Sequence, residues 1–432
     1  MNSDSSKKRI LILASKLGYQ TRSVADAAKS LEIEVAFGTD RCHKLDDPWG
    51  DGAMALHLEK PEDAASEIVR ETQGRNLDAI LALGDRPTAT AAYADRALSL
   101  KGNSPEAVGV CRNKLRQRET LIDAGLLVPR FFSFPLAEKL IDVVKRVTFP
   151  CVVKPMSLSA SQGVIRANNL DEFRAAIDRI HALYQSPEIV AMREPSHDRV
   201  LVEEYIPGDE VSVEALITEG RARILAIFDK PDPLEGPYFE ETIYVTPSRL
   251  PQQTLDDIAD CASKSIAAIG LVHGPVHAEF RINDAGVWPL DIAPRPIGGL
   301  CSRALRFGDD KISLEELILR HALDLPGSGL LRENCAAGVM MIPVPRSGIL
   351  ECVEGIEEAK QVSGIEDVLI TARLHDYIAA WPEGSSYPGF IFSRSDSPEA
   401  AEAALREAHA KLNFVITPRL PVEHPATRRF TA

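Results

Sequence analysis

The sequence predicts a multidomain protein with α/β and α+β regions, on the strength of three patterns. About the first hundred residues alternate apolar strand patterns with helical patterns, which is typical of an open α/β domain. From about residue 149 a smaller α+β pattern follows, with short apolar strands, a loop of small residues and a long helix. The last part of the chain contains several short strands and one helix, so we expect a β-rich C-terminal region.

The N-terminal region predicts strands and helices in alternation. Its first strand, RILILA at residues 9–14, is apolar throughout, as in strands buried on both faces of a parallel sheet. In order, the predicted elements are a strand at 9–14, a helix at about 24–31, a strand at 33–37, a helix at about 61–71 and a strand at 77–83. The turn at 84–88 includes Pro87, which suits the first turn of the next helix. Ligands bind beyond the carboxyl ends of strands in such sheets, so this turn is a candidate substrate edge, with an ordinary strand-to-helix turn as the alternative.

The following segments contain two lysines of interest. Lys114 lies within residues 105–126, which predict one or two helices, and by itself is typical of a solvated helix charge. Lys154 ends the apolar strand in FPCVVKP, where its ammonium is expected to be partly desolvated. A buried ammonium is costly without an anionic partner, so a phosphate group is a reasonable partner for Lys154.

A loop of small residues follows Lys154 at residues 156–163 and includes Ser157, Ser159 and Ser161. Backbone amides of such a loop can fold over phosphate oxygens. The loop lacks the Gly-x-x-x-x-Gly-Lys pattern of a Walker loop, so a P-loop fold is disfavoured. The alternative is a polar hairpin tip, and a helix is predicted next, from about residue 170 to 181.

The segment LVEEYIPGDEVSVE at residues 201–214 predicts two strands separated by a proline-glycine break. The break leaves backbone groups of Tyr205 and Ile206 exposed, and such groups can bind the edge of a flat heterocycle. Glu210, just past the break, could accept hydrogen bonds from ribose hydroxyls. An acidic surface hairpin is the alternative.

A predicted hairpin at residues 276–293 organises the chain. Apolar Val276, Ala278 and Phe280 alternate with polar residues, which is the pattern of a strand with one apolar and one polar face. NDAG turn chemistry follows, and in the second strand Leu290 and Ile292 are expected to share one face, with Asp291 and Ala293 on the other. Pairing about Ala285 places Glu279 opposite Asp291.

The carboxylates of Glu279 and Asp291 predict a metal site. Two carboxylates about 5 Å apart repel by about 3 kcal/mol at an effective dielectric constant of about 20, unless a cation or a shared proton lies between them. A pair of hard oxygen ligands without a cysteine or histidine cluster suits Mg²⁺ bridged to phosphates. Arg295 and the Gly298-Gly299 turn follow, so a fixed cation and a turn without side chains could meet phosphate oxygens. The alternative is an acidic hairpin face that meets water.

A proline-rich loop at residues 229–249 is long enough to be functional or mobile. Tyr238, Phe239, Glu241 and Ser248 on it could border an acceptor pocket, although loop packing is favoured for each. The remaining predicted elements are helices at 252–270, 313–323 and 398–412, and strands at 223–227, 337–342, 348–353, 368–372 and 389–393.

Composition excludes several classes. The 432 residues are 45% hydrophobic and 26% charged, as in an ordinary soluble protein. The net charge of -14 argues against a broad nucleic-acid or anionic-membrane surface. Seven scattered cysteines indicate neither a disulfide framework nor a zinc site, and no apolar run is long enough for a membrane helix. We therefore expect a cytoplasmic protein, with residues 9–14 as a strand and not a signal peptide.

Taken together, these motifs resemble the ATP-grasp superfamily. The VVKP strand with its serine loop, the VEEYIPGDE segment, and the HAEF and LDIAPRPIGG strands occur in that family's order. The chain is most similar to carboxylate-amine ligases of the L-amino-acid ligase type, and SYPGFIFSRSDSPEAAEAAL resembles the tail of biotin-carboxylase-like proteins. The resemblance implies a Rossmann-like pre-ATP-grasp domain at 1–103, an ATP-grasp domain at 104–325 with a small lobe at about 128–200, and a C-terminal β-rich domain at 326–432.

The resemblance also implies roles for particular residues. Lys114 and Lys154 would contact the α- and β-phosphates of ATP. Arg295 would stabilise the transferring phosphoryl group, and His277 would lie near the reacting carboxylate. The other implied contacts are Ser159, Ser161 and Gly163 over the β- and γ-phosphates, Glu203, Glu204, Tyr205 and Ile206 at adenine, Glu210 at the ribose, and Glu279 and Asp291 at Mg²⁺, with Mn²⁺ as a substitute.

The implied function is an ADP-forming ligase that joins a small-molecule carboxylate, activated as an acyl phosphate, to an amine, without nucleic acid or membrane partners and with a homodimer left open. The family usually has Glu and Asn where this chain has Asp291 and Ala293, so a second metal site is weakened, altered or absent. Two rivals therefore stay open. One is another ATP-grasp enzyme, such as a biotin-carboxylase-like or purine-pathway enzyme, and the other is an ATP-binding protein without catalytic activity.

Overall fold

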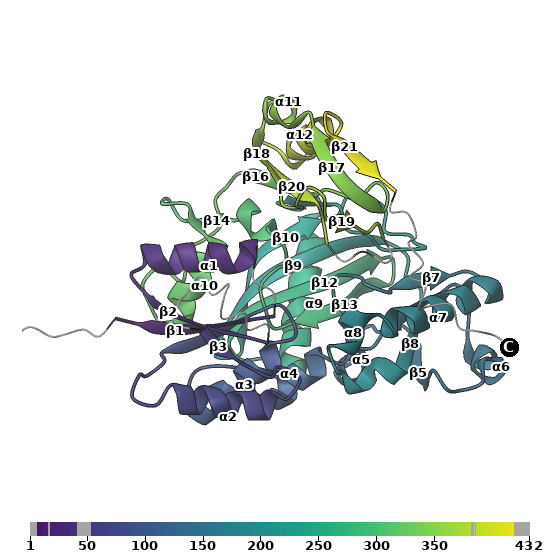
Figure 1. Cartoon of the computed structure of the whole chain (residues 1–432), viewed down its shortest axis with the longest axis horizontal. Helices are drawn as coiled ribbons and strands as arrows, with labels where there is room; N and C mark the ends of the chain where they lie inside the picture. Colours follow the sequence, from purple (N-terminus) through teal and green to yellow (C-terminus); the bar gives the residue numbers. More distant parts are fainter. Residues whose placement is uncertain (1–6, 16–17, 41–52, 382–383, 385, 419–432) are drawn as a thin grey trace, which may run out of the picture.

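The computed structural model describes residues 7–15, 18–40, 53–381, 384 and 386–418 (Figure 1). Its N-terminal region forms a parallel sheet in the order β3-β2-β1-β4. The elements are β1 (Arg9–Ala14), α1 (Tyr19–Ser30), β2 (Glu34–Thr39), β3 (Ala53–Ala55), α2 (Pro61–Glu71), β4 (Ala79–Leu83) and α3 (Thr88–Leu98). The predicted alternation is confirmed, and every residue of β1 is buried. The short β3 was not predicted, and Pro87 caps α3 instead of entering its first turn.

A small lobe follows, built on an antiparallel sheet in the order β5-β8-β6-β7. Helix α7 packs its apolar side on this sheet. The predicted helical segment at 105–126 is two helices, and Lys114 begins the second. Before the small lobe come α4 (Pro105–Cys111) and α5 (Lys114–Asp123), whose apolar residues pack with those of the central sheet. The elements of the small lobe are β5 (Phe131–Pro135), α6 (Leu140–Val143), η2 (Val144–Arg146), β6 (Cys151–Pro155), β7 (Ile165–Ala167), α7 (Leu170–Tyr184), α8 (Pro187–Val190), η3 (Pro195–Asp198) and β8 (Arg199–Glu204).

The centre of the molecule is an eight-stranded sheet in the order β13-β12-β9-β10-β11-β16-β20-β18. Its strands are β9 (Asp209–Thr218), β10 (Arg221–Asp229), β11 (Ile243–Thr246), β12 (Gly274–Asn283), β13 (Gly286–Ala293), β16 (Ala336–Met341), β18 (Ile365–Ile370) and β20 (Gly389–Ser395). Strands β16, β18 and β20 come from the predicted C-terminal domain and yet continue the sheet of β9 to β13. The predicted boundary at 325/326 therefore falls within one sheet, and the domain division stays a prediction.

The remaining elements cover this sheet or extend from it. Helix α9 lies on one face of β9, β12 and β13, and α12 packs against β16 and β20. They are α9 (Gln252–Ile269), η4 (Cys301–Ala304), β14 (Arg306–Phe307), β15 (Ile312–Ser313), α10 (Leu314–Ala322), β17 (Gly348–Glu354), α11 (Ile356–Lys360), β19 (Tyr377–Ile378), α12 (Pro398–His409) and β21 (Asn413–Thr417).

The hairpin of β12 and β13 confirms that Glu279 lies opposite Asp291. Its two-residue turn would by itself set Glu279 opposite Leu290. A β-bulge at Leu290 shifts the register by one residue and brings Asp291 into place. The bulge also corrects one expectation, because Leu290 lines the central cavity beside Asp291 instead of sharing the buried face of Ile292.

The two faces of β12 differ as predicted. Val276, Ala278 and Phe280 are buried against α9. The opposite face of β12 carries polar side chains that line the cavity beside the small lobe. Figure 1 shows the small lobe at the right, with α7, α8, β7 and β8. The pattern of the strand therefore aims its polar residues at the junction of the two lobes.

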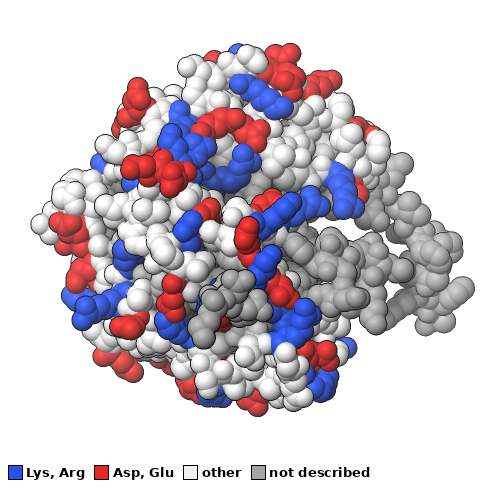
Figure 2. All heavy atoms as spheres, turned by 90° about the vertical axis from the view of Figure 1, so that its left-hand side faces the viewer, with Lys and Arg blue, Asp and Glu red and all other residues white. Residues whose placement is uncertain are grey.

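The outer surface on the N-terminal side carries acidic and basic side chains interspersed, without a broad field of one sign on the face that Figure 2 shows. Among the described residues, no helix combines the length and apolarity that a membrane span requires.

Candidate active site

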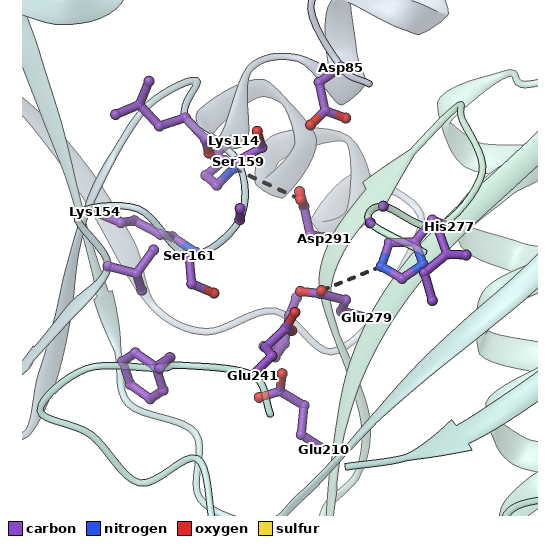
Figure 3. A pocket seen from close by; sticks show the side chains of 18 of the residues that line it. Asp85, Lys114, Lys154, Ser159, Ser161, Glu210, Glu241, His277, Glu279 and Asp291 are labelled. Carbon is purple, nitrogen blue, oxygen red and sulfur yellow. Dashed lines mark hydrogen bonds and ion pairs between the residues drawn. The ribbon is translucent and has the colours of Figure 1, made fainter. Parts of the chain in front are cut away.

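A cavity of about 420 Å³ lies where the small lobe, the central sheet and the N-terminal region meet (Figure 3). The turn after β4 contributes Gly84 and Asp85, which confirms that this turn borders the cavity. Each predicted site residue except Gly163 lines the cavity: Lys114, Lys154, Ser159, Ser161, Glu203, Glu204, Tyr205, Ile206, Glu210, His277, Glu279, Asp291 and Arg295. Residues scattered over 180 positions of sequence are therefore gathered at one site by the fold.

Lys154 shares one buried carboxylate with a second cation. Its Nζ lies 2.5 Å from Glu203 Oε2, and Arg118 Nε donates to Glu203 Oε1 at 2.8 Å. Burial lowers the pKa of Lys154 to about 8, against the opposing effect of Glu203. Lys114 begins α5, and its Nζ donates to the carbonyl of Leu158 at 3.0 Å. Because two cations share one carboxylate here, the site has positive charge left for an anionic ligand.

The serine loop turns sharply above these lysines. Ala160 and Ser161 both adopt left-handed backbone conformations, with φ of 53° and 52°. Gly163 is left-handed as well, and a Cβ there would lie 2.9 Å from Pro155 Cγ. Gly163 thus lets the loop pack on β6 and does not itself face the cavity. Ser159 and Ser161 point into the cavity from the loop (Figure 3).

The predicted backbone contacts with a heterocycle are only partly available. The N–H of Tyr205 donates to the carbonyl of Pro150, and the carbonyl of Ile206 accepts from Arg281. No acceptor among the described residues takes the N–H of Ile206, which is therefore available to a ligand. The carboxylate of Glu204 pairs at the surface with Arg130, 2.9 Å away.

Three glutamates that line the cavity lie close together around the side chain of Lys230. Glu210, Glu241 and Glu279 can place carboxylate oxygens within 4.8 Å of one another, as a metal site requires. Lys230, from the end of β10, contacts all three, at 2.8 Å from Glu210 and 3.4 Å from Glu279. Asp291 lies outside this set and approaches Lys114 at 3.9 Å.

The three carboxylates differ in proton affinity. Burial raises the pKa of Glu241 to about 7, although Lys230 opposes it. Burial acts to raise the pKa of Glu279 too, but Lys230 and His277 outweigh it and hold that pKa well below its usual range. Glu279 is therefore ionised and suited to a divalent cation, whereas Glu241 can exchange a proton near neutral pH.

His277 and Arg295 each have a buried carboxylate partner. Glu214 Oε1 lies 2.5 Å from Nδ1 of His277. Burial acts to lower the pKa of His277, but Glu214 outweighs it and the pKa rises to about 9. Arg295 Nε donates to Asp85 Oδ1 at 2.8 Å. The cavity thus holds two fixed positive groups beside Glu279 and Asp291.

Several residues of the site were not predicted from sequence. Glu241 and Phe239 line the cavity, although loop packing was favoured for both, whereas Ser248 stays at a local turn. The partners Arg118, Glu214 and Lys230 were missed altogether. A signal existed for Glu214, since an acidic residue in phase with Glu210 on an otherwise apolar strand predicts a shared face. Arg118 and Lys230 carry no such signal, because their partners come from other elements.

Two segments of the chain match known protein-family models. Residues 147–304 match the family model for the ATP-grasp domain, and residues 340–417 match L-amino acid ligase C-terminal domain 2. The chain therefore has the ATP-grasp fold, and its residues 340–417 are similar to the C-terminal region of L-amino acid ligases. Proteins with an ATP-grasp domain use ATP and a divalent metal.

Known proteins agree with this placement. The structure of L-amino acid ligase from Bacillus licheniformis is similar with a TM-score of 0.80 and 27% identity, over 95% of this chain and 99% of that one. Phosphoribosylglycinamide synthetase from Anaerococcus prevotii shares the fold, with a TM-score of 0.67 and 18% identity over 95% of this chain and all of the other.

Sequence relatives match over a smaller part of their length. Alanine–anticapsin ligase of Bacillus amyloliquefaciens is 26% identical over 301 residues, which are 65% of this chain and 62% of the relative. Protein y4rH of Sinorhizobium fredii is 25% identical over 327 residues, which are 75% of this chain and 65% of the relative. The chain thus matches less than two thirds of the length of either relative.

Proposed function

We propose that this protein is an ADP-forming ligase that activates a carboxylate as an acyl phosphate and joins it to an amine. The observation that carries the proposal is the cross-strand pairing of Glu279 with Asp291 in a cavity that also contains Lys114, Lys154 and Arg295. Paired carboxylates suit a divalent cation, and three cations suit a polyphosphate. The likeness to an L-amino acid ligase along 95% of the chain supports amino acids or dipeptide-type molecules as substrates.

For the nucleotide, we assign Lys114 and Lys154 to the α- and β-phosphates and the serine loop, with Ser159 and Ser161, to the β- and γ-phosphates. The N–H of Ile206 would bind the adenine edge. Two predicted roles are revised on the contacts above. Glu203, occupied by two cations, would position Lys154 instead of binding adenine, and Glu210, held by Lys230 and Arg281, would brace the floor of the cavity instead of binding ribose. The surface side chain of Glu204 is not given a direct contact.

For the metal, we assign Glu279 and Asp291. Lys230 contacts all three glutamates but lies closer to Glu210, at 2.8 Å, than to Glu279, at 3.4 Å, and Glu279 is paired with Asp291 across the hairpin. A bound Mg²⁺ would offset the phosphate charge as phosphoryl transfer proceeds, and Mn²⁺ takes the same oxygen ligands. Ala293 offers no side-chain oxygen, so a single site is proposed for these two residues.

The residues around the metal site suit acyl transfer. Arg295, held by Asp85, would stabilise charge on the transferring phosphoryl group and the acyl phosphate. His277, with its pKa raised to about 9 by Glu214 against the effect of burial, stays protonated at neutral pH and would donate a hydrogen bond, not act as a base. Glu241, whose pKa burial raises to about 7, is suited to accept the proton that the attacking amine loses.

The proposal is tested by measuring ADP release with paired carboxylate and amine substrates, and by mass spectrometry of the products. The expected result is ADP and an amide in a one-to-one ratio, with hydroxylamine trapping the acyl phosphate when the amine is omitted. ADP release that needs bicarbonate and gives a carboxylated product would instead identify a carboxylase-type enzyme, and a ribonucleotide product would identify a purine-pathway ligase.

One observation favours a second candidate, a nucleotide-binding protein without catalytic activity. Ala293 removes an oxygen that related enzymes use, and Asp291 is shorter than their glutamate. Tight ATP binding with no ADP produced across a broad panel of carboxylates and amines would support that candidate.

A further inference from the structure

Residues 234–241, which we call the strap, form the middle of the loop between β10 and β11. The strap is held to the central sheet by Arg281, which donates to the carbonyl of Leu234 and whose guanidinium lies 5.5 Å from the ring of Phe239. At its far end, Phe239 and Glu241 line the cavity. The strap therefore carries two cavity residues that lie outside the helices and strands, although Tyr244 of β11 donates a hydrogen bond to Glu241 at 2.8 Å.

The small lobe grips the strap from the other side. The N–H of Arg166 donates to the carbonyl of Pro237 at 2.8 Å, and Arg166 Nη1 donates to the carbonyl of Glu235 at 2.7 Å. Tyr238 forms a β-bridge with Ile165, so the strap pairs with the edge of β7. Its hydroxyl also accepts from Arg179 on α7. A single stretch of the strap is thus fixed to two elements of the small lobe.

The same strand edge begins where the serine loop ends. Ser161 points into the cavity and stands four residues before Ile165 in the chain. Arg166 also places its guanidinium 4.0 Å from the ring of Tyr205, in the segment that joins the small lobe to β9. The serine loop thus continues directly into β7, and β7 is bonded to the strap.

Close packing makes this contact stiff. Gly236 has a φ of +92°, and a Cβ there would lie 2.8 Å from the Cβ of Arg166. Any larger side chain at this position would force strap and strand apart. The strap, Arg166 and Tyr238 thus form one packed unit across the boundary between the lobes.

We infer that Arg166 and Tyr238 are positioning residues that couple closure of the serine loop over the nucleotide to the placement of Glu241 and Phe239 in the cavity. Neither Arg166 nor Tyr238 lines the cavity itself. The catalytic consequence of this coupling rests on the proposed ligase function. Without the contact between β7 and the strap, the nucleotide would still bind, but Glu241 and Phe239 would be displaced from the cavity and the acyl phosphate would react with water.

The test combines hydrogen exchange with product ratios, in Arg166→Ala and Tyr238→Phe, with Arg174→Ala as the matched control. Arg174 lies on α7 like Arg179 but pairs only at the surface, 3.5 Å from Asp171. In the wild-type protein, a non-hydrolysable ATP analogue with Mg²⁺ is expected to slow amide exchange in residues 234–241. Arg166→Ala is expected to lose this protection, Tyr238→Phe to lose part of it, and Arg174→Ala to keep it.

The catalytic arm measures amide formed per ADP and the KM for each substrate. Arg166→Ala should raise the KM of the amine by about five- to tenfold, the scale of one or two lost hydrogen bonds, and lower the amide-to-ADP ratio below one. Wild-type exchange unaffected by the analogue, or an Arg166→Ala protein that folds and keeps both protection and ratio, would overturn the inference. If the wild-type protein makes no ADP, the ligase proposal fails, but the hydrogen-exchange measurement still tests the coupling. If Arg166→Ala does not fold, the same measurements are made on Tyr238→Phe.

Discussion

Glu203 and Glu204, at the end of β8, allow the loss of a buried carboxylate to be compared with the loss of an exposed one. Glu203 is 4% exposed and holds both Arg118 and Lys154, whereas Glu204 pairs with Arg130 at the surface. Glu203→Gln leaves two cations in the interior without their anion. The two substitutions are chemically identical and adjacent, so Glu204→Gln is a matched control.

The expected cost follows from the contacts. Removing one partner of a buried ion pair costs about 3–5 kcal/mol, because the remaining charge is left desolvated. The glutamine oxygen keeps one hydrogen bond, worth roughly 1 kcal/mol, so we expect Glu203→Gln to lower the free energy of unfolding by about 3 kcal/mol. Glu204→Gln should cost far less, since an exposed pair contributes little. Urea unfolding followed by tryptophan fluorescence measures both.

The same substitution bears on nucleotide binding. Burial already lowers the pKa of Lys154 to about 8, and loss of the Glu203 carboxylate lowers that pKa further. The variant should therefore lose affinity for an ATP analogue between pH 6.5 and 8, as Lys154 gives up its proton, more steeply than the wild type. Equal losses of stability in the two variants, or a pH dependence identical to wild type in Glu203→Gln, would refute this account.

Three further outcomes follow from the site. Glu279→Gln should remove the gain in ATP-analogue affinity that Mg²⁺ gives the wild type, by about tenfold or more, measured by titration with and without the metal; a full Mg²⁺ effect in the variant would contradict the assignment. Asp85→Asn releases Arg295 and should lower kcat by roughly 10- to 100-fold with little change in the KM for ATP, as steady-state ADP release can show. The pKa of His277 is raised from 6.5 to about 9, so its pairing with Glu214 stabilises fully below about pH 6.5 and that stabilisation is lost as pH rises through 9. We therefore expect the free energy of unfolding in urea to fall between pH 6 and 9.5 by about 3 kcal/mol less in Glu214→Gln than in the wild type. An equal fall in the two proteins would disprove the pairing.

Much of the candidate site could be predicted because its residues lie on strands with strong local patterns. The alternation around Glu279 predicted which side chains share a face, and the apolar run before Lys154 predicted its burial. Partners that come from distant elements could not be predicted. Arg118 approaches Glu203 across 85 positions of sequence, and no local period links them. The same reason explains Lys230, whose position among three glutamates depends on how β10 meets β9 and β12.

By itself, the sequence determined the order of strands and helices, and a hairpin whose polar residues include Glu279 and Asp291. These features depend on periodicity and turn chemistry, which act over a few residues. Only the tertiary structure decided that a bulge at Leu290 places Asp291 opposite Glu279, and that the strap reaches from the small lobe to the cavity. Both depend on contacts between elements that meet only after folding, so the energies that select them are absent from any local stretch of chain.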